Sequence, residues 1–330
     1  MNWKQISQRV TDGGEITQAE ALGILNAPDD ALLSVLDAAF AIRLRYFGRG
    51  VRLHVLCNAR SGGCSEDCGY CSQSAHARQS ATQRYPWRSN EELVAGAREA
   101  HRMKAIRYCV VSSGRAPADA EMKDICETVR SIKAEVPTRV CLSLGLLSPM
   151  QARQLKGAGV DRYNHNLETS ERHFPHLCTT HSYADRVATA RAVKAAGLEL
   201  CCGGLLGAGE TAEDRVDLAF ALRDLAADSI PINFLDPRPG TPFEHYPRLK
   251  PTVCLRALAM FRFVHPSTEI RVAGGREACL GPMQALALYP ANAMFTDGFL
   301  TTPGQGCDAD RALLNAAGFC IDGVTQTQRP

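Results

Sequence analysis

The chain has 330 residues, of which 45% are hydrophobic and 22% charged, a composition that is typical of a globular protein with one large core and excludes intrinsic disorder. Its formal net charge of +2, without a run of Lys or Arg, argues against a nucleic-acid partner. The first thirty residues mix charged and apolar residues, and no stretch reaches the roughly 18 apolar residues of a membrane span, so we expect a cytoplasmic protein with no membrane partner.

Short β-rich runs alternate along the chain with segments of helical apolar period. After a helical N-terminal segment over about residues 1–45, the predicted strands are 51–59, 106–114, 139–147, 161–169, 198–207, 229–237, 269–277 and 292–300. The predicted helices are 90–105, 119–136, 148–159, 182–197, 211–227, 251–266, 281–291 and 308–319. This alternation predicts an α/β fold, a (β/α)8 TIM-type barrel over about residues 50–320, with a doubly wound open sheet as the competing topology. No linker or composition break divides the chain, so we expect a single domain over residues 1–330.

The stretch CNARSGGCSEDCGYCSQ, residues 57–73, follows the first predicted strand, where a barrel places its chemistry. In a reducing compartment cysteines are expected to be metal ligands, catalytic thiols or buried packing residues rather than disulfide partners. Cys64, Cys68 and Cys71 are spaced C-x3-C-x2-C, whereas a zinc site usually has four ligands, often as two C-x2-C pairs. Three thiolates on a four-iron cluster with one open iron fit this spacing. A zinc site with a distant fourth ligand and a set of buried structural cysteines are the alternatives.

The triplet, with Tyr70 before its last cysteine, resembles the signature of the radical S-adenosylmethionine enzymes. The stretches NARSGGCSEDCGYCSQS, YNHNLETS, CCGGLLGAGET, PINFLDPRPGTP, IRVAGGRE and FLTTPGQG are together similar to the biotin synthase family, over about residues 15 to 320. The resemblance implies that Cys64, Cys68 and Cys71 hold a 4Fe-4S cluster whose open iron binds S-adenosylmethionine. It implies a sulfurtransferase that inserts sulfur between C6 and C9 of dethiobiotin. Neither carbon is acidic, so acid-base catalysis cannot break those C-H bonds and radical chemistry is required.

A second set of residues falls on four different predicted strands: Cys109, Cys141, Cys201 and Arg271. Taken singly, a cysteine in an apolar strand is most often a small buried hydrophobic residue. The resemblance implies that these four residues hold a 2Fe-2S cluster that donates the sulfur.

Two neighbours of this set are predicted from the alternation of strand faces. Arg107 lies two residues before Cys109 and shares its face, and the resemblance places it near the second cluster. Cys202 directly follows Cys201, and the family usually has Ser at position 202. If the strand is regular, only one of Cys201 and Cys202 faces the barrel interior.

The stretch YNHNLETS places Asn164, Asn166 and Glu168 on one strand face, if the period of two holds. Amide side chains offer both donors and acceptors, which suits a ureido ring. The resemblance implies that Asn166 and Asn233 bind the ureido group of dethiobiotin and that position 168 contacts the ribose of S-adenosylmethionine. The family has Asp or Asn at position 168. This chain has Glu168 there, whose side chain is one methylene longer.

The stretch GGLLGAGE, residues 203–210, is Gly-rich but lacks the G-x-G-x-x-G spacing of a dinucleotide site. It is similar to the G-x-I-x-G-x-x-E element of the radical S-adenosylmethionine enzymes. By this resemblance Gly203, Gly207 and Glu210, together with Tyr70, are expected to bind S-adenosylmethionine.

Two other functions remain open at this point. A different radical S-adenosylmethionine enzyme, such as a mutase or a hydrogenase-maturation enzyme, would keep the first triplet but have no use for the second set. A non-catalytic iron-sulfur or zinc protein would have no use for Asn166 and Asn233. The resemblance further implies a homodimer and an electron donor such as flavodoxin or ferredoxin.

Overall fold

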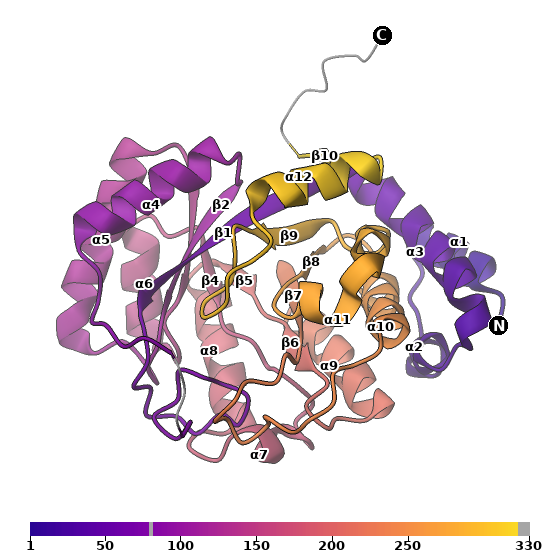
Figure 1. Ribbon diagram of the computed structural model, residues 1–330, viewed down its shortest axis with the longest axis horizontal. Coiled ribbons are helices and arrows are strands. Elements are labelled where there is room, and N and C mark those ends of the chain that lie inside the picture. Colours follow the sequence, from indigo (N-terminus) through magenta and orange to yellow (C-terminus); the bar gives the residue numbers. More distant parts are fainter. Residues whose placement is uncertain (79–81, 323–330) are drawn as a thin grey trace, which may run out of the picture.

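The computed structural model describes residues 1–78 and 82–322 and forms a closed parallel barrel surrounded by helices (Figure 1). The last eight residues of the expected single domain therefore lie outside the described residues. The strands are β1 (Gly50–Arg60), β2 (Arg107–Ser112), β3 (Arg139–Ser143), β4 (Arg162–Asn164), β5 (Glu199–Cys201), β6 (Gly204–Leu206), β7 (Ser229–Phe234), β8 (Glu269–Val272), β9 (Ala293–Thr296) and β10 (Cys320–Ile321).

The barrel closes where β9 pairs with β1. The strands follow the chain order from β1 to β5 and continue through β7, β8 and β9, and every ladder between the described strands is parallel. A doubly wound open sheet would leave two free edges, so closure confirms the predicted (β/α)8 barrel and excludes its competitor.

Two predicted strands differ in the structure. The fifth is divided into β5 and β6, both of which pair with β7, and the break falls at Cys202 and Gly203. The fourth ends at Asn164 rather than continuing to residue 169. Glu168 has a φ of +69°, a left-handed conformation that a strand cannot contain. The period-of-two argument for Asn164, Asn166 and Glu168 is therefore wrong beyond Asn164.

The helices that follow the strands cover the outside of the barrel (Figure 1). They are α4 (Asn90–Arg102), α5 (Met122–Glu135), α6 (Pro149–Gly157), α7 (Phe174–Leu177), α8 (Tyr183–Ala195), α9 (Ala212–Asp224), α10 (Pro251–Val264), α11 (Arg276–Leu280) and α12 (Cys307–Ala316). The helix predicted over 281–291 is instead a 3-10 helix, η3 (Gly281–Leu288), directly after α11. The short strand β10 was not predicted, and it extends the sheet beside β1.

The N-terminal segment is helical, as predicted, and packs on the outside of the barrel beside α10 (Figure 1). It contains α1 (Trp3–Thr11), α2 (Gln18–Leu25), the short 3-10 helix η1 (Asp29–Ala31) and α3 (Leu32–Phe47). A second short 3-10 helix, η2 (Asp119–Glu121), directly precedes α5. The side chains of Asn2 and Thr17 accept hydrogen bonds from the first turns of α1 and α2, which explains where these helices begin.

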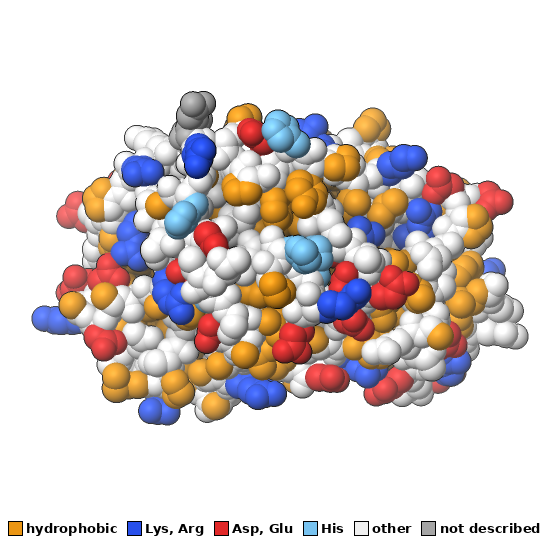
Figure 2. Space-filling model, turned by 90° about the horizontal axis from the view of Figure 1, so that it is seen from below, with side chains coloured by type: hydrophobic (Ala, Val, Ile, Leu, Met, Phe, Trp, Pro, Cys, Tyr) orange, Lys and Arg blue, Asp and Glu red, His pale blue; other side chains and the backbone are white. Residues whose placement is uncertain are grey.

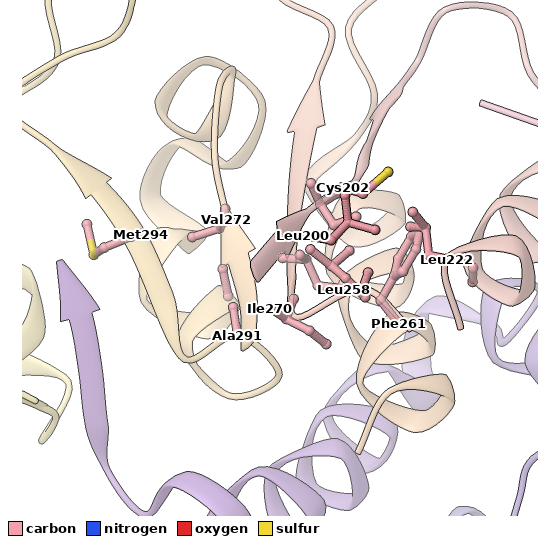
Figure 3. Close-up of a cluster of buried hydrophobic side chains, with 14 of the residues drawn as sticks. Leu200, Cys202, Leu222, Leu258, Phe261, Ile270, Val272, Ala291 and Met294 are labelled. Carbon is pink, nitrogen blue, oxygen red and sulfur yellow. The ribbon is translucent and has the colours of Figure 1, made fainter. Parts of the chain in front are cut away.

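The main core lies between the outer face of the barrel and the helices. Figure 3 shows Leu200 and Cys202 from the β5 region packed against Leu222 of α9 and against Leu258 and Phe261 of α10. Cys202 is fully buried in this apolar layer. Its side chain therefore lies on the outer face of the barrel wall, away from the interior.

The surface is mixed in charge. On the face seen in Figure 2, Lys and Arg side chains alternate with Asp and Glu, and apolar side chains lie between them. Within the described ranges, no helix combines the length and the apolar character that crossing a membrane requires.

Candidate functional site

A cavity of about 350 Å³ opens at the carboxyl ends of the barrel strands. It brings together eight of the predicted site residues, which are Tyr70, Cys71, Cys109, Cys141, Asn166, Glu168, Asn233 and Arg271. The predicted residues outside its lining are Cys64, Cys68, Arg107, Cys201, Gly203, Gly207 and Glu210. The cavity thus lies between the first thiol triplet and the second set of thiols.

The cysteine triplet lies in the loop after β1, which backbone contacts from distant segments hold in place. The Gly69 N-H donates to the Leu177 carbonyl oxygen (2.8 Å), and the Gly69 carbonyl accepts from the Phe243 N-H (3.2 Å). A Cβ on Gly69 would meet the Phe243 ring at 2.6 Å, so this close approach requires glycine. Burial raises the pKa of Cys71 to about 11, and the nearby Cys64 thiol adds to the rise.

Sequence analysis missed the neighbour of Cys68. The sulfur of Cys178 and a ring nitrogen of His181 lie within 4.8 Å of the Cys68 sulfur and of each other. The hydrogen bond with Cys178 raises the pKa of Cys68 and lowers that of Cys178 to about 4. No spacing in the sequence marks Cys178, because it reaches Cys68 only through α7.

His181 is nevertheless oriented as a hydrogen-bond donor toward this group. The Arg186 Nε donates to His181 Nε2 (3.0 Å), which places the ring proton on Nδ1. That proton faces Glu66 and the Cys178 sulfur, 3.2 Å away. A metal ion at Nδ1 would require the opposite tautomer, so Cys68, Cys178 and His181 fit a zinc site poorly.

Glu168 is buried at the rim of the cavity. Its carboxylate lies 3.6 Å from Arg186 Nη1 and 3.4 Å from the Asn166 amide nitrogen, and it also accepts from the Tyr70 hydroxyl. Burial raises the pKa of Glu168, and the positive charge of Arg186 opposes the rise. Glu168 has a left-handed backbone conformation, and its side chain lines the cavity together with Asn166. The predicted strand would also have placed the two side chains on one face, but through regular alternation.

Two amide side chains face the cavity and also tie its wall to glycine-containing loops. Asn166 Oδ1 accepts from the Gly203 N-H (3.1 Å), and Asn233 Oδ1 accepts from the Gly274 N-H (2.9 Å). The Asn233 amide donates to the Gly204 carbonyl (3.2 Å). Each amide keeps further donor or acceptor capacity for a ligand, since Asn can form about four hydrogen bonds.

The segment over residues 203–210 contains β6 and the turn that follows it, and Glu210 holds that turn in place. Its two carboxylate oxygens accept from the Gly207 and Ala208 N-H groups, both at 2.7 Å, and Arg215 Nε donates to one of them at 2.8 Å. A Cβ on Gly203 would meet the Pro231 carbonyl oxygen at 1.9 Å, so the segment can lie against β7 only with glycine there. Only Leu205 of this segment lines the cavity.

The second set of residues meets inside the barrel. Cys109 and Cys141 are direct partners in the β2–β3 register. The hydrogen bond between them lowers the pKa of Cys109 and raises that of Cys141. Arg271 Nη2 lies 3.4 Å from the Cys201 sulfur, and all four side chains are at most 4% exposed. Cys201 therefore faces the interior and Cys202 does not.

Charged side chains that sequence analysis did not single out lie one layer below these thiols. They are Arg162, Glu199 and Glu269, which with Arg107 form ion pairs that join β2 to β5, β4 to β5 and β4 to β8 across the barrel interior. A signal for Glu199 and Glu269 exists, because they stand two positions before Cys201 and Arg271, as Arg107 does before Cys109. Arg162 precedes no residue of the second set in this way.

The second set fits an anionic iron-sulfur group. Among the described residues, Arg107 Nε and Nη1 and Arg271 Nε are buried donors without a hydrogen-bond partner. Such donors are costly unless a ligand accepts from them. Three buried thiols beside unpartnered arginine donors supply both the ligands and the counter-charge that a thiolate-bound cluster needs.

Other cavity residues come from loops that sequence analysis left without a role. Arg238 and Asp236 follow β7, and Thr301 and Thr302 follow β9. They complete the lining of the cavity.

Family comparisons match nearly the whole chain. Residues 59–222 match the radical SAM superfamily, and residues 231–320 match the biotin and thiamin synthesis associated domain. The chain is 50% identical over 317 residues to a biotin synthase of Salinibacter ruber, which covers 96% of this chain and 88% of that protein. It is 47% identical over 326 residues to a biotin synthase of Halalkalibacterium halodurans, covering 99% and 98% of the two chains.

Solved structures support the fold. A methylornithine synthase superposes with a TM-score of 0.84 at 19% identity and covers 96% of this chain and 97% of that one. An [FeFe]-hydrogenase maturase superposes with a TM-score of 0.83 at 16% identity, covering 98% and 76%. At such identities the likeness concerns the barrel alone.

Proposed function

Because this chain belongs to the biotin synthase family of the radical SAM superfamily, we propose roles for its site residues in the insertion of sulfur into dethiobiotin. The family membership makes the chain a radical S-adenosylmethionine sulfurtransferase that forms biotin. The observation that carries the residue assignment is one cavity with a thiol set on either side. A different reaction of this superfamily would leave Cys109, Cys141, Cys201 and Arg271 without a purpose.

We assign the 4Fe-4S cluster to Cys64, Cys68 and Cys71 and a 2Fe-2S cluster to the second set. When bound, these groups supply the electron for reductive cleavage of S-adenosylmethionine and the sulfur for the product. The loop after β1 carries the first thiols and brings Cys71 into the cavity lining. Arg271 and Arg107 provide positive charge beside the second thiols.

The cavity residues orient the two small molecules between these sets. Asn166 and Asn233 present amide donors and acceptors to the ureido ring of dethiobiotin. Glu168, with Tyr70, accepts from the ribose hydroxyls of S-adenosylmethionine. Gly203, Gly207 and Glu210 shape the loop behind Leu205, so that their part in cofactor binding is to hold the cavity wall. The apolar side chains of Phe295 and Phe299 exclude water from the region between them.

The wider assignments are also proposals. The two family-matched regions form one domain, which is supported by the single closed barrel to which strands from both regions contribute. An electron donor such as flavodoxin or ferredoxin, a homodimer and a cytoplasmic location follow the family resemblance. The fourteen free cysteines are consistent with a reducing compartment.

The function is tested by product formation. Anaerobically reconstituted protein, given S-adenosylmethionine, dethiobiotin and a low-potential reductant, is expected to form biotin together with 5′-deoxyadenosine and methionine, as measured by mass spectrometry. Cleavage of S-adenosylmethionine without biotin would indicate another radical reaction. Binding without cleavage would indicate a non-catalytic iron-sulfur protein.

Glu168→Gln is expected to weaken S-adenosylmethionine binding by about 1 to 3 kcal/mol, because a charged acceptor is replaced by a neutral amide. Equilibrium binding to the reconstituted protein measures this loss. Glu171→Gln, an exposed position on the same loop, is the matched control and should bind normally. An unchanged dissociation constant for Glu168→Gln would place the ribose contact on another residue.

A further inference from the structure

Glu269 lies at the centre of the charged layer beneath the second set of thiols and is 3% exposed. Its Oε1 accepts from Ser229 Oγ (2.6 Å), Arg162 Nη1 (2.7 Å) and Arg271 Nη2 (3.2 Å). These donors come from β7, β4 and β8. One carboxylate oxygen thus connects three strands directly below the thiols.

The same carboxylate also reaches β1. Arg52 Nη1 donates to Oε2 (3.3 Å), and His54 Nε2 lies 3.4 Å from Oε1. His54 is fully buried, and burial holds its pKa at about 3, so the ring is neutral. Of the two, only Arg52 adds charge, and it is one-third exposed at the barrel end.

Arg271 depends on Glu269 for its position. Its Nη2 donates to Ser229 Oγ (2.6 Å) and to Glu269, and the same group lies 3.4 Å from the Cys201 sulfur. Ser229 in turn donates to Glu269, so removing the carboxylate would leave the Ser229 hydroxyl without its acceptor and would leave Arg271 Nη2 with Ser229 Oγ as its remaining oxygen acceptor. The guanidinium also lies 4.8 Å from the centre of the Phe295 ring.

The balance of charges in this layer also indicates that Glu269 keeps Arg271 in position. Arg107, Arg162 and Arg271 are at most 4% exposed, and Glu269 is the buried acid among them, whereas Glu199 is 35% exposed at the edge. Glu269 lies between Arg162 and Arg271, two like charges that repel each other. If Glu269 lost its charge, the repulsion between the two guanidinium groups would no longer be offset, and Arg271 would move away from Arg162 and from Cys201.

We propose that Glu269 is a positioning residue for sulfur insertion, which holds Arg271 against Cys201 and balances the charge beneath the second set of thiols. The inference rests on the proposed second cluster. Glu269 touches neither that cluster's thiols nor the substrate cavity, and it acts through Arg271, Ser229 and Arg162.

The test compares Glu269→Gln with Glu199→Gln in anaerobically reconstituted full-length protein. Glutamine keeps the size of each side chain and removes one negative charge. Glu199 binds Arg107 and Arg162 but makes no contact with Arg271, so it is the matched control. The measurements are iron and sulfide content, the absorption and reduction potential of the second cluster, 5′-deoxyadenosine formation, and the melting temperature of the cluster-free protein.

Glu269→Gln is expected to lower the iron content from about six towards about four per chain, the loss of one two-iron group. Any second cluster that remains should have a raised reduction potential, because a buried negative charge has been removed. Cleavage of S-adenosylmethionine should continue while biotin formation falls at least about tenfold. Glu199→Gln should retain the irons and most of the product.

Three outcomes would overturn the inference. The first is wild-type iron content and product in Glu269→Gln. The second is equal loss of both clusters with a much lower melting temperature of the cluster-free protein, which would show a purely structural role. The third is a wild-type protein that forms biotin with only about four irons, which would reject the proposed second cluster itself and is recognised before any variant is compared.

Discussion

Replacing Cys64, Cys68 or Cys71 by alanine is expected to abolish reductive cleavage of S-adenosylmethionine. A four-iron cluster held by two thiolates is labile, and without it no electron reaches the sulfonium group. The iron content of each reconstituted variant and its 5′-deoxyadenosine yield, measured by chromatography, check the prediction. Formation of 5′-deoxyadenosine at the wild-type rate in all three variants would contradict the assignment of the triplet.

The structure adds a control that the sequence does not suggest. The Cys178 sulfur lies within 4.8 Å of the Cys68 sulfur and could replace it as a ligand in Cys68→Ala. The double variant Cys68→Ala/Cys178→Ala removes this substitute. If the single variant retains a cluster and the double variant does not, residue 178 has taken the ligand position, and the assignment of the loop still holds. Cys178→Ala alone should retain four irons at the first site.

Replacing Cys201 by alanine is expected to remove the second cluster and abolish biotin formation, because the thiol faces the barrel interior beside Arg271. Iron content should fall from about six towards about four, while S-adenosylmethionine cleavage persists. The iron and sulfide counts, together with biotin measured by mass spectrometry, check this prediction.

Cys202→Ala is the matched control, because the adjacent thiol is equally buried but packs on the outer face against α9 and α10 (Figure 3). It should keep both clusters and the product, and it should lose only about 1 kcal/mol of unfolding free energy through the smaller side chain. If Cys202→Ala empties the second site and Cys201→Ala does not, the register of β5 is wrong by one residue.

The sequence by itself determined the barrel, and it predicted the two thiol sets, the first from its spacing and the second from the family resemblance. Alternating apolar periods of two and 3.6 predict strand and helix in turn, and eight repeats are the number that closes a parallel sheet. The spacing of Cys64, Cys68 and Cys71 is local, so it can be read along the chain. The inward direction of Cys109 and Arg107 also follows from local alternation within one regular strand.

Local rules failed where the backbone leaves the regular strand. Alternation extended the fourth strand to Glu168, but the chain ends that strand at Asn164 and adopts a left-handed conformation at Glu168. The Glu168 side chain still lines the cavity, but the alternation of strand faces does not explain this, because residue 168 is not in a regular strand. A 3-10 helix at residues 281–288 likewise replaced a predicted α-helix, and it directly follows α11, which ends where Gly281 adopts a φ of +49°.

Contacts between distant segments were decided only by the tertiary structure. Cys178 meets Cys68 across 110 positions of sequence because α7 lies beneath the loop after β1, and Glu269 meets Arg162 and Ser229 because barrel closure brings β4, β7 and β8 around one interior. A single sequence records that Glu269 is charged and stands two residues before Arg271. It does not record that the donors around this carboxylate converge on one oxygen, because that convergence depends on the stagger and tilt of separate strands in the closed barrel.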